Sequence, residues 1–257
     1  MLLLIEPFSI AKAGNKDFEY EDAYWPSGIT EVEDSYFRFS VADGATESSF
    51  SKIWAVQLVE AFGKGELNVG TFWADIGKQQ PIWLRNVTSK PLPWYAEEKV
   101  HSGAFAAFMG LEISEDSTTG IITWKATGLG DCCIFQVGNR SDRSKKDLIV
   151  NFPFQSSSAF GNTPALISSV KVNNNSIEKD LLQTDGTALA NDVFYLMTDA
   201  IACWFLKEVE EGLSPWETLE DLNTRDGTSF RDLIDELRQE KKLKNDDVTI
   251  LKIVIGL

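Results

Sequence analysis

The chain has 257 residues, of which 43% are hydrophobic and 25% are charged, so it can bury a core without disulfide staples. The 24 Lys and Arg against 39 Asp and Glu give a net charge of −15, and such a field repels nucleic acid and anionic lipid. We therefore expect no nucleic-acid partner and no membrane partner. Grouped carboxylates instead favour divalent cations.

The first predicted element is a strand at the amino terminus, over residues 1–5. This apolar run meets Glu6 at once and has no basic segment before it, which is not typical of a signal peptide. No later apolar stretch approaches the ~18 residues that a membrane helix needs. The three cysteines form neither a disulfide framework nor a CxxC pair, so the sequence predicts a cytoplasmic protein.

Further strands are predicted where apolar residues alternate or where β-branched and aromatic residues are enriched. These segments are residues 36–42, 121–137, 193–198 and 248–255. Residues 138–146 are typical of a polar hairpin tip, which lies between the segments 133–137 and 148–152.

Helices are predicted from apolar residues at helical spacing, over residues 46–62 and 230–237. Ser214 followed by Pro215 is typical of a helix start. The tryptophans and prolines between residues 73 and 94 predict an irregular stretch. We find neither an internal repeat nor a long linker, which predicts one domain over residues 1–257.

Histidine content limits the possible chemistry. His101 is the only histidine, which excludes His-rich zinc sites, and the lack of a CxxC pair excludes the usual structural zinc sites. A Ser-His-Asp triad would need His101, for which the sequence offers no obvious partner. Acid–base and metal chemistry must therefore depend on carboxylates.

Each of four predicted strand boundaries carries an aspartate. These residues are Asp43, Asp131, Asp199 and Asp246. Several strand ends can meet in space, and carboxylate oxygens suit hard cations. Gly44 lacks a Cβ atom, which lets its backbone carbonyl approach a metal closely. The alternative interpretation is that Asp and Gly follow strands because they form turns, but four together weaken it.

Six short motifs occur in a characteristic order along the chain. They are Glu-Asp-Ala at 21–23, Ser-Val-Ala-Asp-Gly at 40–44, Ser-Gly-Ala-Phe-Ala-Ala at 102–107, Gly-Asp at 130–131, Thr-Asp-Ala at 198–200 and Asp-Asp-Val-Thr at 246–249. In this order they resemble the type 2C, metal-dependent (PPM) protein serine/threonine phosphatases, most closely the compact bacterial members. The matches cover nearly the whole chain, and together they are specific.

The resemblance implies an α+β fold, a four-layer αββα sandwich of two antiparallel β-sheets flanked by helices. It implies two Mn²⁺ or Mg²⁺ ions, with a weaker third possible, and a bridging water that attacks the phosphorus of phosphoserine or phosphothreonine. Such a two-metal clamp needs no histidine.

The resemblance also assigns roles to individual residues. Asp43 would bridge the metals and, with Asp22, act as a catalytic residue. The metal ligands would be Asp22, Asp43, Gly44, Asp131, Asp199 and Asp246, with Asp131 serving the weaker metal. Glu21, with Asp22, would hold metal-bound waters.

The sequence departs from the family at four positions. Asp17 stands where the family places a phosphate-binding arginine, and the nearest cations are Lys12 and Lys16, which become candidate substrate residues. The other departures are Ala200, Cys203 and Asp247, which replace a glycine, a third-metal acid and an asparagine. A weakened third-metal site is the expected consequence.

The hairpin tip is the densest basic patch of the chain, with Arg140, Arg143, Lys145 and Lys146. One hypothesis is that this tip helps to dock an acidic or phosphorylated partner near the site, with Arg140 and Arg143 as candidate substrate residues. The alternative is a solvated loop.

Three functions remain open from the sequence. The leading hypothesis is a phosphoprotein phosphatase whose substrate is the product of a serine/threonine kinase. The second is a pseudophosphatase that serves as a regulatory binding module, and the third is a phosphatase of small phosphoesters. Turnover of an aryl phosphate with Mn²⁺ would separate the second from the other two.

Overall fold

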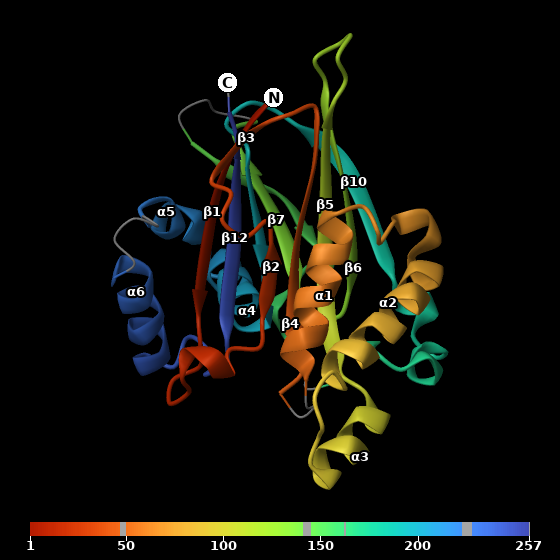
Figure 1. Cartoon of the computed structure of the whole chain (residues 1–257). Coiled ribbons are helices and arrows are strands. Elements are labelled where there is room, and N and C mark those ends of the chain that lie inside the picture. The colour runs from red at the N-terminus through yellow and green to blue at the C-terminus, as the bar shows by residue number, and fades with distance from the viewer. Residues whose placement is uncertain (47–49, 141–144, 162, 223–227, 257) are drawn as a thin grey trace.

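Two antiparallel β-sheets pack face to face, and helices cover both outer faces (Figure 1). This arrangement, seen in a computed structural model, confirms the expected αββα sandwich. The structure describes residues 1–46, 50–140, 145–161, 163–222 and 228–256. None of the helices in these ranges is long and apolar enough to cross a membrane.

The first sheet has the strand order β3-β1-β12-β11-β7-β8. Its strands are β1 (Leu2–Ile10), β3 (Glu31–Glu33), β7 (Cys133–Gly138), β8 (Asp147–Phe152), β11 (Val193–Met197) and β12 (Val248–Ile255). The second sheet has the order β10-β6-β5-β4-β2, and a short strand, β9, pairs with β5. Its strands are β2 (Ala23–Trp25), β4 (Tyr36–Gly44), β5 (Phe105–Glu115), β6 (Ile122–Leu129), β9 (Ile167–Ser168) and β10 (Leu182–Ala188).

The helices are divided between the two outer faces. Those of the second sheet's side are α1 (Ser51–Gly63), α2 (Phe72–Val87) and α3 (Trp94–Ser102), and those of the first sheet's side are α4 (Asp199–Glu210), α5 (Pro215–Glu220) and α6 (Thr228–Gln239). α1 packs on β4 and β5, while α4 packs on β12.

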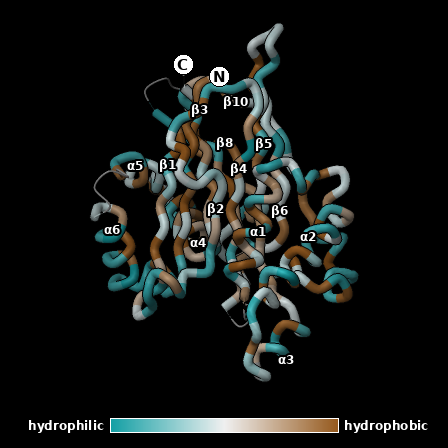
Figure 2. The backbone as a smooth tube through the Cα atoms, viewed as in Figure 1, coloured by the Kyte–Doolittle hydropathy of each residue, from teal (hydrophilic) through white to brown (hydrophobic). Residues whose placement is uncertain are grey.

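Three apolar layers hold the sandwich together. The middle layer lies between the sheets and contains Phe39 and Val41 of β4, while Ala42 of the same strand belongs to the layer under α1. Alternate residues of a strand face opposite sides, so one strand serves two layers. In Figure 2 the strands carry most of the hydrophobic residues, and much of α6 is hydrophilic. Burial of this apolar area is the main stabilising contribution to the fold.

Several predicted elements are confirmed. The segments 36–42, 193–198 and 248–255 correspond to β4, β11 and β12, and the predicted hairpin corresponds to β7 and β8. The amino-terminal strand continues to Ile10, five residues beyond the predicted end. Helices α1 and α6 lie where apolar spacing predicted them, and α5 begins at Pro215.

The predicted strand 121–137 is two strands, β6 and β7, because the chain changes sheet at Gly130. Gly130 has a φ of +98°, and a Cβ atom there would lie 2.6 Å from the Cβ of Ala107. Only glycine meets both conditions without strain. The turn delivers Asp131 to the junction of the two sheets.

The expectation of an irregular stretch between residues 73 and 94 is wrong for most of its length. Residues 72–87 form α2 with Pro81 inside the helix. Proline disfavours a helix interior because it lacks an N–H group. Burial of Phe72, Ile76 and Trp83 on one face of α2 outweighs that cost.

Candidate metal centre

Two aspartates lie at strand ends of the second sheet, Asp22 directly before β2 and Asp43 near the end of β4. β2 pairs with β4 in a register that sets Ala23 opposite Ala42, so Asp22 lies beside Asp43. β4 pairs with β5 so that Asp43 is opposite Ala107. The strand register therefore brings together two acids that are 21 positions apart in the sequence.

The first sheet contributes its acids at the same end. The last residue of β11, Met197, is opposite Cys133 of β7 and Ile250 of β12. Asp199 follows β11 by two residues, and Asp131 precedes β7 by two residues. Antiparallel pairing thus places these acids at one edge of the sheet, beside the start of β12.

A cavity of about 330 Å³ lies between these strand ends. Its lining includes four acids and one cation, which are Asp43, Asp131, Asp199, Asp246 and Lys244. The aspartates that the sequence singled out at strand ends therefore share one cavity. Asp22 lies behind Asp43 and is only 2% exposed.

Burial and mutual repulsion disfavour the ionised forms of these acids. Burial, more than any other cause, raises the pKa of Asp22 well above its usual range, although the Thr249 hydroxyl donates to Asp22 Oδ2 at 2.7 Å. Burial likewise raises the pKa of Asp43, and the charges of Asp22 and Asp199 add to this effect. The pKa of Asp131 rises to about 7, chiefly through burial. A cation in the cavity would reverse these effects.

Lys244 reaches into the acidic cluster, and nothing in the sequence predicted this. Its Nζ lies 2.7 Å from Asp246 Oδ2 and 3.2 Å from Asp199 Oδ2. Burial alone would lower the pKa of Lys244, but the hydrogen bonds and charges of these two acids raise it. One side chain of the chain itself therefore neutralises part of the cluster.

The donor set suits a hard divalent cation. The converging aspartates all offer oxygen ligands, and within the described residues Asp22 Oδ1 is buried without a hydrogen-bond partner. A Cβ atom on Gly44 would lie 2.8 Å from the Glu21 carbonyl oxygen and 3.1 Å from Ser51 Cβ. This crowding requires glycine at the end of β4, beside Asp43.

The cluster is not arranged as a closed ligand set. Across the described ranges, no group of three or more His, Cys, Asp or Glu side chains is positioned to hold a metal ion. Asp199 and Asp246 are partly exposed at a helix start and in a loop, and Lys244 separates them. The side chains fit a hard cation by their chemistry, whereas their positions do not form a closed ligand set.

Glu21 and Lys12 lie at the edge of the cluster. Glu21 Oε1 accepts a hydrogen bond of 2.5 Å from the Ser51 hydroxyl at the start of α1. Lys12 Nζ donates to Thr46 Oγ1 at 3.4 Å, and Thr46 lines the aspartate cavity. Lys12 lines a neighbouring cavity and not the aspartate cavity, so the structure brings it to the edge of the site through its contact with Thr46.

Lys16 and Asp17 lie elsewhere. Lys16 Nζ is 5.6 Å from the centre of the Phe18 ring, and Lys16 does not line the aspartate cavity. Asp17 lines a separate cavity of about 120 Å³ with Arg231 and Arg238. The Asp17 carboxylate thus has cationic neighbours of its own.

The hypothesis that the hairpin tip docks a partner near the site is wrong for Arg140. Arg140 follows the far end of β7 and pairs with the buried Asp192, at 2.8 Å and 2.6 Å. Its charge is used to hold the opposite end of the first sheet. Arg143 lies outside the described residues.

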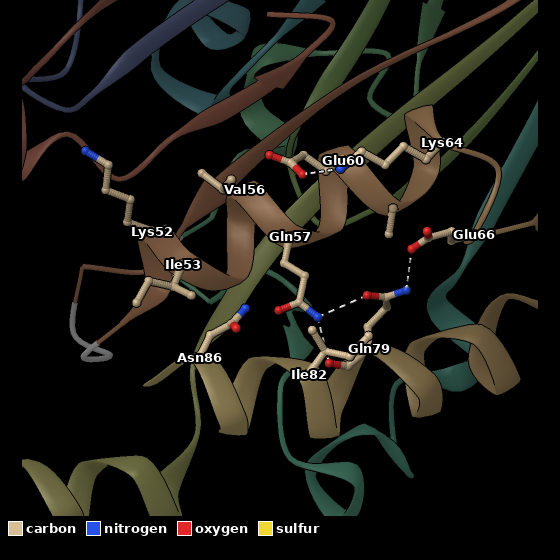
Figure 3. A pocket seen from close by; sticks show the side chains of 11 residues that line it. Lys52, Ile53, Val56, Gln57, Glu60, Lys64, Glu66, Gln79, Ile82 and Asn86 are labelled. Carbon is tan, nitrogen blue, oxygen red and sulfur yellow. Dashed lines mark hydrogen bonds and ion pairs between the residues drawn. The ribbon is translucent and has the colours of Figure 1, made fainter. Parts of the chain in front are cut away.

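A larger cavity, of about 460 Å³, lies between α1 and α2 (Figure 3). Gln57 of α1 donates to the carbonyl oxygen of Gln79 at 2.7 Å and to its side-chain oxygen at 3.0 Å. Ile53 and Val56 line this cavity. Its lining has two acids, Glu60 and Glu66, and includes none of the strand-end aspartates. It offers no convergent oxygen donors comparable to those of the smaller aspartate cavity.

Comparison with known proteins gives a fold match without a sequence match. No protein-family model and no curated protein matches the chain. The catalytic domain of serine/threonine protein phosphatase PstP, in complex with two manganese ions, superposes with a TM-score of 0.57 at 12% identity over 100% of both chains. RsbX in complex with magnesium gives a TM-score of 0.52 at 11% identity, covering 99% of this chain and 96% of that chain.

A third solved structure is the PPM Ser-Thr phosphatase MsPP from Mycobacterium smegmatis in complex with cacodylate. It gives a TM-score of 0.54 at 10% identity and covers 98% of each chain. The likeness extends over the whole sandwich and agrees with the resemblance seen in the sequence motifs. The chain has the fold of the metal-dependent PPM serine/threonine phosphatases.

Proposed function

We propose that the chain, as a single domain over residues 1–257, is a protein phosphatase that hydrolyses phosphoserine and phosphothreonine with two Mn²⁺ or Mg²⁺ ions. The observation that carries this proposal is the shared cavity of Asp43, Asp131, Asp199 and Asp246. It lies on a fold that known serine/threonine phosphatases also have. Its substrate would be the phosphorylated product of a serine/threonine kinase.

Asp43, Asp199, Asp246 and the Gly44 carbonyl would hold the two metals, and Asp131 would hold a weaker third. When bound, the metals lower the pKa of a water molecule and neutralise charge on the phosphoryl oxygens. Thr249 anchors the buried Asp22 carboxylate at 2.7 Å, and this contact sets the back wall of the site.

We propose that Lys12 binds a phosphate oxygen of the substrate. Its Nζ already bonds the hydroxyl of Thr46 on the cavity lining. Asp247 accepts the backbone N–H of Lys12 at 2.8 Å, which orients this segment towards the cavity. We propose that Lys12 takes over part of the work of the missing arginine.

The test is hydrolysis of an aryl phosphate and of a phosphoserine peptide, measured with Mn²⁺ and with excess chelator. We expect turnover of both substrates with Mn²⁺ and none with the chelator, because four grouped acids need a cation to bind an anion. Full turnover in the chelator would contradict the proposed metals. Loss of turnover on every substrate would favour the pseudophosphatase, and turnover of small phosphoesters alone would favour the third hypothesis.

Replacing Lys244 by Gln is expected to tighten Mn²⁺ binding about tenfold, or ~1.4 kcal/mol. The ammonium group contacts both Asp199 and Asp246, so it competes directly with a divalent cation for these acids. Titration of free Mn²⁺ by electron paramagnetic resonance measures the affinity. Lys64→Gln is the matched control, because Lys64 pairs with Glu60 on α1. Unchanged affinity in Lys244→Gln would show that the lysine does not compete.

A further inference from the structure

A second cavity, of about 220 Å³, adjoins the aspartate cavity and carries the opposite charge. Three lysines line it, which are Lys207, Lys242 and Lys244, against a single acid, Asp199. Asp199, Lys244 and Gly161 line both cavities, so the two share a wall. This local excess of positive charge stands out in a chain with a net charge of −15.

The three lysines come from one helix and one connecting segment. Lys207 lies on the exposed side of α4, near its carboxyl end, and the other two lie in the connection from α6 to β12. Side chains from separate elements converge on this cavity, as the lining shows. A run of charge along one solvated helix face would not produce this arrangement.

Lys207 and Lys242 keep their charges available. The side chain of Lys207 bonds the Cys203 thiol, and its charge acts on Glu210 without forming one of the ion pairs of the described residues. The Glu210 carboxylate is held by Ser157, at 2.7 Å from both its N–H and its hydroxyl. Lys242 pairs with Glu240 at 2.9 Å, and about half of each side chain is exposed. Such an exposed pair contributes little and can be exchanged for another anion.

Cys203 adds no negative charge to the lining of this cavity. The resemblance places a third-metal acid at this position, one helical turn after Asp199. Here a half-buried thiol lines the cavity, and its Sγ lies 3.9 Å from the Ser157 carbonyl oxygen. The lysines therefore face a neutral group instead of a second acid.

We propose that the lysine-lined cavity binds a second anionic group of the substrate, a carboxylate or a phosphate close in sequence to the phosphoresidue that is hydrolysed. This inference rests on the proposed function, because it takes the aspartate cavity as the place of the reacting phosphate. When the phosphate of a peptide lies in the aspartate cavity, the neighbouring residues of that peptide lie beside the wall that the two cavities share. An acidic neighbour then enters the positive cavity, whereas a basic neighbour is repelled.

The first test compares three phosphoserine peptides that differ at the flanking positions, with Ala, with Asp, or with a second phosphoserine. We expect the wild-type protein in Mn²⁺ to have a higher kcat/KM for the two acidic peptides than for the Ala peptide. In Lys207→Gln/Lys242→Gln this preference should fall about tenfold, which corresponds to ~1.4 kcal/mol. The matched control, Lys64→Gln/Lys179→Gln, removes two exposed charges elsewhere and should keep the preference. Comparison of kcat/KM between the Asp peptide and the peptide with a second phosphoserine shows which anion the cavity prefers.

The second test measures binding without turnover. A fluorescent Asp-flanked peptide, with a non-hydrolysable phosphonate analogue in place of phosphoserine, is titrated by anisotropy in Mn²⁺, at low salt and at high salt. The double lysine variant should bind about tenfold more weakly than wild type at low salt, and the difference should shrink at high salt because exposed charges are screened.

The two tests separate the possible failures. No turnover of the Ala peptide by the wild-type protein in Mn²⁺ would contradict the proposed function, and the anisotropy titration would still decide the inference. Equal kcat/KM values for all three peptides, together with equal affinity of wild type and variant, would overturn the lysine-lined cavity as a binding site. An equal loss in the control variant would overturn it as well, because the effect would then come from net charge.

Discussion

Replacing Asp43 by Asn is expected to lower kcat for an aryl phosphate by at least about a hundredfold in Mn²⁺, since even residues behind metal ligands affect activity 10–100-fold. Asp43 is the penultimate residue of β4 and lines the aspartate cavity, where its carboxylate would serve both metals. Asparagine keeps the shape of the side chain and removes its charge. Steady-state kinetics with Mn²⁺ measure the effect, and undiminished turnover would contradict the assignment of Asp43.

The same substitution is expected to stabilise the metal-free protein. Burial and the charges of Asp22 and Asp199 raise the pKa of Asp43 in the folded state. Because the pKa of this acid is higher in the folded state than in the unfolded state, the free energy of unfolding falls as the pH rises from the unfolded pKa to the folded pKa. Each unit between the two values corresponds to about 1.4 kcal/mol. The neutral amide of the Asp43→Asn variant carries no such cost, so the advantage of the variant over wild type should grow from pH 4 to pH 8.

Calorimetry in chelator measures this advantage as a higher Tm, by about 2–4 °C for each kcal/mol in a chain of this size. Asp192→Asn is the matched control with the opposite sign. Asp192 is buried and accepts hydrogen bonds from Arg140 and Gln136, so its neutral variant should lose stability. A lower Tm for Asp43→Asn would mean that the cluster is held by contacts other than those described.

The sequence predicted the strand ends of the site because their signals are local. Period-two alternation before Asp43 and β-branched residues around Asp199 and Asp246 can be recognised within short windows. Which strand ends meet depends on register between segments far apart in the chain. The resemblance to a family supplied that information, and the pairing of β2, β4 and β5 provides its structural basis.

Central strand β5 was missed for a physical reason. Six consecutive residues, 106–111, are buried, because β5 lies between two neighbouring strands and is covered on both faces. A strand buried on both faces shows no alternation, so periodicity cannot tell it from a buried helix. The helix α2 was missed because Pro81 disfavours a helix locally, while its apolar face is rewarded only in the packed fold.

The acidic partners of Arg140 and Lys244 could not be predicted from composition or motif. Arg140 lies in a basic run that suggests a docking loop, but its partner Asp192 is 52 positions away in the sequence. The pair lies at the end of the first sheet that is away from the aspartate cavity. Lys244 has no local signal and reaches the acids through the path of its loop. The partners of long side chains on loops are determined by the tertiary structure, which a short sequence window does not reveal.

Asp247 is expected to tolerate neither Asn nor Ala, although the resembling family has asparagine at this position. Its Oδ1 accepts the backbone N–H of Lys12 at 2.8 Å, and its Oδ2 accepts that of Glu21 at 2.7 Å. The side chain is buried, with 6% exposed. Both carboxylate oxygens are therefore used to hold the amino-terminal segment that carries Lys12, Glu21 and Asp22.

An asparagine has one oxygen, so in either orientation its NH₂ group would face one of the two N–H donors. A buried donor left without an acceptor costs about 1–3 kcal/mol, and alanine would leave two of them. Relief of repulsion opposes this cost, because the charge of Asp247 contributes to the raised pKa of Asp22. The two charge-assisted hydrogen bonds are direct contacts and outweigh that more distant repulsion. We expect losses of about 1–2 kcal/mol for Asp247→Asn and about 3 kcal/mol for Asp247→Ala.

Urea unfolding in chelator measures both losses, and the adjacent Asp246 provides the control. Asp246 is partly exposed and bonds Lys244, so Asp246→Asn should change stability by less than about 1 kcal/mol. Its effect should appear instead as weaker Mn²⁺ binding, because Asp246 faces the cavity. The two neighbouring aspartates would thus have different roles: Asp247 would anchor the amino-terminal segment, and Asp246 would bind the metal. Equal stability of Asp247→Asn and wild type would show that the amide satisfies both N–H groups, and the anchoring role of the second carboxylate oxygen would then be wrong.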